Sequence, residues 1–190
     1  MVWHIHFRKI SVLLLLVLAL ASGWGGMAAS QVSIGGPFSL TGGDGSRVND
    51  REFRGQYLLV FFGYTNCPDL CPAAMNNIAG ALAVLKRDAV PVRAVFITID
   101  PVRDTAGIVA AYARLFSPEI LGLTGTPAQI QMVEREFHVF VSRPAPQSAE
   151  ISHSALIYLM GKDGKFITAF PDSVSGAALA GAVRKVAGAG

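Results

Sequence analysis

Cys67 and Cys71 lie in one short segment, and they are the two cysteines of a 190-residue chain. The segment follows a strand-like apolar run at residues 57–62 and precedes a helical pattern that begins near Ala73. We therefore expect a strand, a short loop and a helix, with Cys71 as the N-cap residue and Pro72 at the first helical position. Unpaired N–H groups at a helix start favour a thiolate over a thiol. A cysteine placed there is a better nucleophile and a better metal ligand.

The spacing of the two cysteines leaves three kinds of site open. Three residues separate them, whereas a thioredoxin-type redox motif has two intervening residues. A structural disulfide, or a pair of inert thiols, is one interpretation, but so local a bridge restricts the unfolded chain little. A dithiol redox site and a soft-metal site are the other two. Zinc usually takes four ligands in a structural site, whereas Cu(I) accepts fewer and softer ones. A third ligand elsewhere in the chain would favour a metal.

The N-terminal residues have the pattern of an export signal. Arg8 and Lys9 precede an apolar stretch, and small residues follow it, with a cleavage position after Ala28 or Ala29. The uninterrupted apolar core is short for a membrane span, but residues 10–29 carry no charge and would be long enough for an uncleaved anchor. We predict a signal peptide or N-terminal membrane anchor at residues 1–29. The expected context is an exported bacterial protein on the periplasmic side of the inner membrane, anchored or released.

The charge of the predicted exported part argues against nucleic acid as a partner. The whole chain has a formal net charge of +3, but without residues 1–29 its 14 basic residues face 13 acidic ones. Lys and Arg form no cluster and do not alternate with aromatic residues, as a nucleic-acid-binding surface requires. We expect no nucleic-acid partner. Residues 30–190 are enough for one domain with its own core.

Strand and helix patterns alternate along this domain. The expected elements, in chain order, are a β-hairpin at residues 38–48, a strand at 57–62, a helix at 73–87, a strand at 92–99, a helix at 105–116, a strand at 120–123, a helix at 127–137, a strand at 138–141, a hairpin of strands at 155–160 and 165–170, and a helix from Asp172 or Ser173 to Val186. This order predicts an α/β fold: a thioredoxin-like three-layer sandwich with an N-terminal β-hairpin and inserted elements. Ligands of open α/β sheets bind beyond the carboxyl ends of the strands, where the cysteine segment begins.

Two histidines lie in the predicted domain, and they differ as candidates for a third ligand. His138 stands at the entry to a predicted strand, and we interpret it as structural. His153 follows a Pro/Ser-rich loop and precedes the strand at residues 155–160. In thioredoxin-like folds the loop before this strand packs against the active-site cysteines, an argument by analogy of fold. Met75 is expected in the core, Tyr64 to pack near the thiols, and Asp69 either to tune them or to be a solvated loop acid.

Four segments together carry a resemblance to a known family. They are FGYTNCPDLCP at residues 62–72, IDPVRDT at 99–105, LGLTGTP at 121–127, and His153-Ser154 leading to Tyr158-Leu159. Over residues 35–186 the chain resembles the Sco/SenC family, the copper-handling assembly factors of cytochrome c oxidase. The paired cysteines with the later histidine are the specific part of this resemblance.

The resemblance implies a thioredoxin-like fold, an N-terminal membrane anchor and one copper ion per chain, as Cu(I) or Cu(II). Its ligands in this chain would be Cys67, Cys71 and His153, and thiolates with imidazole suit copper. The implied partners are the copper-site subunit of cytochrome c oxidase, a periplasmic copper donor and a thiol reductant. Many family members have an acidic residue just before the histidine, where this chain has Ser152. Such a carboxylate can orient the imidazole or balance the metal charge, and Glu150 is the expected substitute.

Two functions follow as hypotheses. In the first, the protein is a copper chaperone that helps metallate the dinuclear copper site of the oxidase and is not an enzyme. In the second, it is a thiol–disulfide oxidoreductase in which Cys67 and Cys71 are the catalytic redox pair and His153 is dispensable. A peroxide reductase is a weaker third hypothesis, because Cys67 lacks the Pro- and Thr-rich approach of such sites. We expect Asp100, Arg103, Asp104 and Thr105 to cap a helix and brace a loop.

Overall fold

The computed structural model describes residues 33–142 and 151–188. The predicted signal or anchor at residues 1–29 and the acidic substitute Glu150 lie outside these ranges, so both stay predictions. Within the described ranges, each helix falls short of a transmembrane segment in length or in hydrophobicity.

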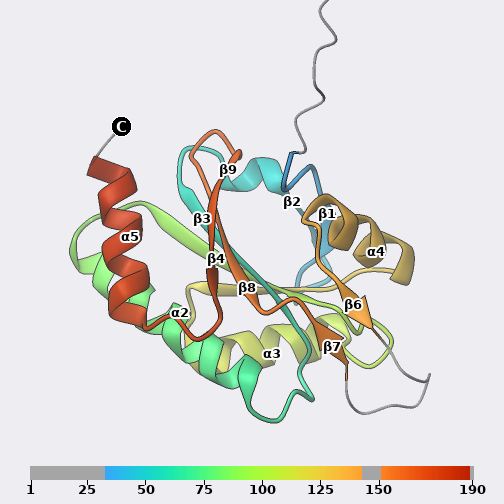
Figure 1. The fold of residues 1–190 in the computed structure, drawn as a ribbon. Helices are drawn as coiled ribbons and strands as arrows, with labels where there is room; N and C mark the ends of the chain where they lie inside the picture. The colour runs from blue at the N-terminus through green and yellow to red at the C-terminus, as the bar shows by residue number, and fades with distance from the viewer. Residues whose placement is uncertain (1–32, 143–150, 189–190) are drawn as a thin grey trace, which may run out of the picture. The chain divides into compact units, whose positions relative to one another are not determined.

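A five-stranded mixed sheet forms the centre of the domain, in the order β5-β4-β3-β8-β9 (Figure 1). Strands β3 (Tyr57–Gly63), β4 (Val92–Thr98) and β5 (Ile120–Leu123) are parallel. Strands β8 (Leu156–Met160) and β9 (Phe166–Pro171) form the predicted antiparallel hairpin beside β3. Every residue of β3 is buried, because this central strand is covered on both faces.

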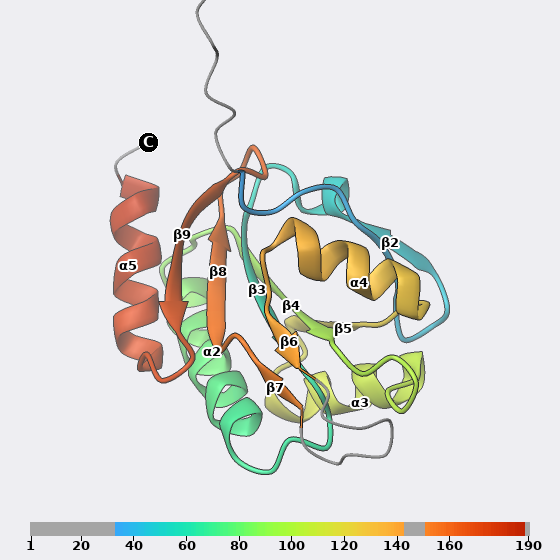
Figure 2. The same ribbon diagram turned by 45° about the vertical axis from the view of Figure 1, so that its right-hand side comes forward.

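Helices cover the two faces of the sheet and complete three layers (Figures 1 and 2). Helices α2 (Leu70–Arg87), α3 (Ala106–Phe116) and α5 (Gly176–Gly188) pack on one face, where they share a core with Leu59 and Phe61 of β3. Successive side chains of a strand point to opposite faces. The alternate residues of β3 therefore lie in a second core on the other face, against α4 (Pro127–Glu136). The predicted three-layer sandwich is confirmed.

The N-terminal hairpin and the predicted cap of α4 are also present. Strands β1 (Ser39–Thr41) and β2 (Arg47–Asn49) pair antiparallel, and a 3-10 helix, η2 (Asp50–Phe53), follows them. At the start of α4, Thr126 and Gln129 form the reciprocal capping box that their spacing predicts.

The start of α2 differs from the prediction. The helix begins at Leu70 with Asp69 as its N-cap residue, so Cys71 lies in the first turn and is not the cap. The Cys71 N–H donates to the Cys67 Sγ at 3.4 Å, and this sulfur replaces the acceptor that a first-turn N–H otherwise lacks. Pro72 fits here because a residue of the first turn needs no N–H donor.

The strand predicted at residues 138–141 begins later in the structure, at Val141. His138 has a φ of +54°, and its N–H and that of Val139 donate back to carbonyls of α4. A left-handed residue just after a helix is a common way to satisfy the last carbonyls. The strand β6 is therefore only Val141–Ser142, and it pairs with β7 (Ser152–His153) in a small antiparallel ribbon.

The last helix begins later than Asp172 or Ser173. Residues 172 and 173 form a turn after β9, and the Val174 N–H donates to the Pro171 carbonyl. The Ser175 hydroxyl accepts from the Ala178 N–H at 3.3 Å, so Ser175 caps the helix. Asp172 is left in a connecting segment at the end of the sheet.

Candidate metal centre

The three predicted ligands, Cys67, Cys71 and His153, lie in the wall of one pocket of about 360 Å³. Cys67 comes from the loop after β3, Cys71 from the first turn of α2, and His153 from β7. The pocket lies at the carboxyl end of β3, where an open α/β sheet binds ligands. The structure thus brings together residues that are up to 86 positions apart in the sequence.

The loop that carries Cys67 is held by a buried acid, Asp104, which is 1% exposed. Its carboxylate accepts hydrogen bonds from the Thr65 N–H at 3.0 Å, the Thr65 hydroxyl at 2.5 Å and the Thr98 hydroxyl at 2.6 Å. These bonds tie the cysteine loop to the end of β4. The prediction that these residues brace a loop is confirmed for Asp104. The predicted cap is present only by position, since Thr105 is the N-cap residue of α3 but makes no side-chain capping hydrogen bond.

Cys71 packs directly against the end of β3, which is possible because Gly63 has no side chain. A Cβ on Gly63 would lie 2.9 Å from the Cys71 Sγ and 2.8 Å from Cε2 of Phe96. A larger residue at position 63 would therefore displace the thiol or the aromatic ring. The glycine allows Cys71 to be fully buried while its sulfur stays in the pocket wall.

His153 presents one ring nitrogen to the thiols. Its Nδ1 lies 2.9 Å from the Ser154 carbonyl oxygen, and a carbonyl only accepts, so Nδ1 carries the proton of a neutral ring. The Nε2 lone pair then faces the Cys71 Sγ at 4.0 Å. The Tyr64 ring packs edge-on against the imidazole, with centroids 6.3 Å apart. The ring is thus oriented from two sides before any ligand binds.

Burial sets the protonation states of the two inner ligands. Burial lowers the pKa of His153 below its usual value, with the Ser154 carbonyl and the Asp172 charge acting in the opposite direction, which favours the neutral imidazole that binds metals. Burial, and then the neighbouring Cys67, raise the pKa of the Cys71 thiol. The expectation that the helix start favours a thiolate is therefore wrong for Cys71, because desolvation outweighs the field of the helix.

The donor set fits a soft metal. Typical bonds from a metal to thiolate and imidazole are about 2.3 and 2.0 Å, so one ion can bridge a sulfur and a nitrogen 4.0 Å apart. In the described part of the chain, no three His, Cys, Asp or Glu side chains already form a closed ligand cluster. Binding through all three would need a side-chain adjustment and the loss of the Cys71 proton.

The other candidates from the sequence fall outside the ligand set. Met75 is fully buried in the core, as expected. His138 is exposed, and its Nε2 lies 3.3 Å from the Ser33 carbonyl oxygen. Asp69 lines the pocket but is exposed. The sequence reasoning missed Asp172, which also lines the pocket. The available signal was its position directly after the last strand, at the same edge of the sheet.

Residues 26–188 match the SCO1/SenC family. The human protein "SCO1 homolog, mitochondrial" is 38% identical over 146 residues, which cover 72% of this chain and 47% of that protein. This chain spans about half the length of the mitochondrial relatives from Arabidopsis thaliana, Mus musculus and Homo sapiens.

Solved structures of copper-bound proteins have the same fold. The crystal structure of Arabidopsis thaliana ScoI with copper bound has a TM-score of 0.76 at 34% identity, covering 82% of this chain and 99% of that one. The structure of Bradyrhizobium japonicum ScoI with copper bound has a TM-score of 0.73 at 37% identity, covering 80% and 99% of the two chains. The thioredoxin-like architecture inferred above is thus that of solved Sco proteins.

Proposed function

Because this chain belongs to the SCO1/SenC family, we propose that it binds one copper ion through Cys67, Cys71 and His153 and transfers it to the dinuclear copper site of cytochrome c oxidase. Copper is the cargo of this reaction. The observation that carries the proposal is the meeting of two thiols and an oriented imidazole nitrogen in one pocket. The copper-bound relatives support the choice of metal.

Copper loading requires the protein to release a proton from Cys71. Cys71 holds its proton firmly while the pocket is empty of metal, because burial raises the pKa of this thiol. Copper binding therefore displaces a proton from Cys71, and the thiolate that forms is a strong soft ligand. His153 needs no such step, because its Nε2 already carries a lone pair that can bind the metal. The hydrogen bond from Nδ1 to the Ser154 carbonyl keeps the ring proton on Nδ1.

Transfer requires an exposed ligand through which a recipient can approach. Cys67 is partly exposed, whereas Cys71 is buried. A thiolate of the recipient can replace Cys67 first, and the remaining two ligands can follow. The copper-site subunit of the oxidase is the proposed recipient, with a periplasmic copper donor upstream. Export and attachment through residues 1–29 remain part of this proposal, and they rest on the pattern of charged, apolar and small residues in that segment.

The test is an anaerobic copper titration of the fully reduced protein with both valences. We expect one equivalent to bind, and Cu(II) to give a thiolate-to-copper charge-transfer band that is lost in His153→Ala. If His153→Ala binds copper with the same stoichiometry and spectrum as the parent protein, the ligand assignment is wrong.

A second function, thiol–disulfide exchange, is favoured by the unequal exposure of the two free thiols. The Cys67 thiolate would attack a disulfide of the oxidase subunit and form a mixed disulfide. Cys71 would then attack Cys67, releasing the reduced substrate and leaving a Cys67–Cys71 disulfide. The high pKa of Cys71 slows this second step, because the thiolate is the attacking species.

Reduction of a model disulfide by the metal-free protein separates the two functions. We expect slow reduction if copper transfer is the function, and the rate separates the two functions because His153→Ala should leave it unchanged under either one. Rapid, stoichiometric reduction by the metal-free protein would make the reductase the better account and would require a thiol reductant as a partner.

A further inference from the structure

We propose that Asp172 is a charge partner of the copper site and makes it favour Cu(II) over Cu(I). The inference rests on the copper site proposed above and adds a residue that neither the cysteine motif nor the histidine motif contains. It concerns the valence preference of the site, which the three ligands alone leave undetermined.

The backbone holds Asp172 at the edge of the pocket. Pro171, the last residue of β9, pairs with Leu156, the first residue of β8. The next residue, Asp172, donates its N–H to the Ala155 carbonyl at 3.0 Å, and its own carbonyl accepts from the Asn77 side chain at 3.4 Å. These main-chain bonds fix Asp172 between the start of β8 and helix α2, where it lines the same pocket as the three ligands.

The carboxylate of Asp172 has no neutralising partner among the described residues. The buried acid Asp104 accepts three hydrogen bonds, and Asp100 pairs with Arg103. Asp172, by contrast, uses only main-chain atoms in its hydrogen bonds to other described residues. The described lining of the pocket contains no Lys or Arg. Among the described lining residues, no cation therefore shields the contents of the pocket from the charge of Asp172.

Asp172 differs in burial from the other acid of the pocket wall. Asp172 is half-buried, whereas Asp69 is exposed. Solvent screens the charge of an exposed carboxylate more than that of a half-buried one. Of the two acids, Asp172 is therefore the one whose charge should reach a metal ion in the pocket.

The total charge of the copper-loaded site explains why Asp172 would favour Cu(II) over Cu(I). Two thiolates, a neutral imidazole and Cu(I) sum to one negative charge, whereas the same ligands with Cu(II) are neutral. A carboxylate in the pocket wall repels the first state and leaves the second nearly unaffected. The residue before His153 is the uncharged Ser152, so in the described part of the chain Asp172 is the half-buried acid that supplies this effect.

The test compares the affinities of the full-length reduced chain for Cu(I) and Cu(II) in the parent protein and in Asp172→Asn. We expect the ratio of Cu(II) to Cu(I) affinity to fall about tenfold, which corresponds to a rise of ~59 mV in the one-electron potential. Asp172→Glu should retain the parent potential. The Asp163→Asn variant, with the same charge change in an exposed turn at the opposite end of the β8–β9 hairpin, should leave it unchanged.

A second-site rescue makes the test independent of side effects of Asp172→Asn. Adding Ser152→Asp to Asp172→Asn places a carboxylate beside His153 and should restore the Cu(II) preference. If the parent binds one copper but Asp172→Asn shifts the potential no more than Asp163→Asn does, the inference is wrong and the proposed function stands. If the parent binds no copper of either valence, the proposed function fails, and the inference fails with it.

Discussion

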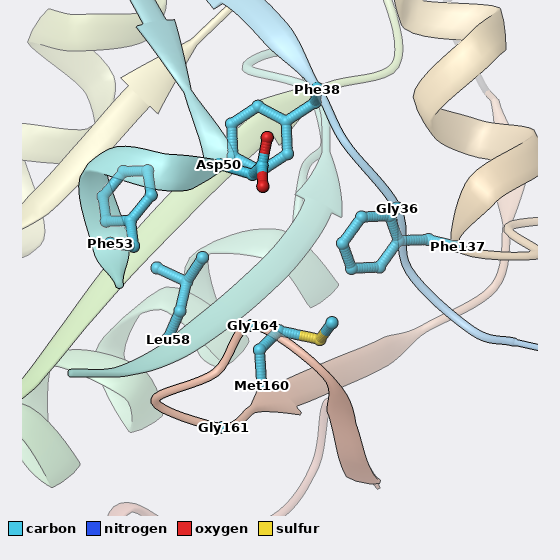
Figure 3. A pocket seen from close by; sticks show the side chains of 9 residues that line it. All are labelled: Gly36, Phe38, Asp50, Phe53, Leu58, Phe137, Met160, Gly161 and Gly164. Atoms are coloured by element: carbon cyan, nitrogen blue, oxygen red, sulfur yellow. The ribbon is translucent and has the colours of Figure 1, made fainter. Parts of the chain in front are cut away.

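The two ends of strand β3 have opposite characters. At the Gly63 end, the pocket of about 360 Å³ is lined by two thiols, an imidazole and two carboxylates. At the Leu58 end, a cavity of about 20 Å³ is surrounded mainly by large apolar side chains (Figure 3). Those side chains are Phe38, Phe53, Leu58, Phe137 and Met160.

The difference shows how one strand can serve both stability and chemistry. A cavity of about 20 Å³ holds one water at most, and an apolar lining gives that water few partners. The Leu58 end therefore acts as core. At the Gly63 end, the missing side chain of Gly63 makes room for the Cys71 sulfur, and the β6–β7 ribbon brings His153 to the same pocket. Changes at the first end should alter stability alone, and changes at the second should alter metal binding.

Cys67→Ser should have the largest effect and should act on metal binding alone. The binding free energy of a metal site, about 10–16 kcal/mol, is divided among its ligands, so losing one of the three proposed ligands should cost roughly 4 kcal/mol, or about a thousandfold in copper affinity. Competition with a chelator of known affinity measures the loss. Cys67 is partly exposed, so urea unfolding of the metal-free protein should change little. Parent-like copper affinity in this variant would remove Cys67 from the site.

Met160→Ala tests the opposite end of the strand. Met160 is 4% exposed and faces the small cavity, so its truncation should lower the free energy of unfolding by about 3 kcal/mol. The copper affinity of the folded protein should stay within about twofold, because the site lies at the other end of β3. A copper affinity that falls together with stability would show that the two ends are coupled.

Asp104→Asn should affect both properties, because this side chain joins the cysteine loop to the sheet. Hydrogen bonds to a charged acceptor contribute about 1.5–3 kcal/mol each, and an amide keeps only part of that, so we expect a loss of about 2 kcal/mol in unfolding free energy. Copper affinity should fall about tenfold, as when an outer partner of a metal ligand is removed. Thr98→Val, which removes one donor to Asp104, should reproduce part of both effects. A loss of stability without a change in copper affinity would limit Asp104 to a structural role.

Much of this fold could be predicted from local patterns in the sequence. The buried run at residues 57–62, the Thr126–Gln129 capping box and the hairpin after Ala155 are determined by neighbours in the chain, and each was confirmed. The errors lie where a side-chain hydrogen bond or an unusual backbone conformation changes a boundary, and no pattern in the sequence records either. The sulfur of Cys67 extends α2 by accepting the Cys71 N–H, and the left-handed His138 delays strand β6.

The site was harder to predict than the fold for the same reason. The meeting of Cys67, Cys71 and His153 in one pocket followed from the motif and from the fold analogy. The protonation states did not, because burial of Cys71 and the bond from His153 to the Ser154 carbonyl depend on packing. The position of Asp172 depends on the pairing of β8 with β9, which no pattern around the cysteines records.

The smallest effect we predict is a dependence of the unfolding free energy on pH, and it arises from Cys71 at the Gly63 end of β3. Burial raises the pKa of Cys71 above its ordinary value of 9.0. Below about pH 9, both the folded and the unfolded chain keep this proton, so Cys71 adds no pH dependence. Above that value the unfolded chain loses the proton while the folded chain keeps it, so stability falls as pH rises, by at most about 1.4 kcal/mol per pH unit.

Urea unfolding of the metal-free reduced protein between pH 8 and pH 10 measures this slope. Cys71→Ala should remove most of the slope above pH 9, whatever it does to the absolute stability. Met160→Ala should lower the whole curve and keep its slope, because no titrating group is changed at that end of the strand. Tyr112, whose pKa is also raised chiefly by burial, adds its own slope only above its ordinary value of 10.0, so the window from pH 9 to pH 10 isolates the thiol. An unchanged slope in Cys71→Ala would mean that the folded chain does not retain the thiol proton, and copper loading would then need no proton release from Cys71.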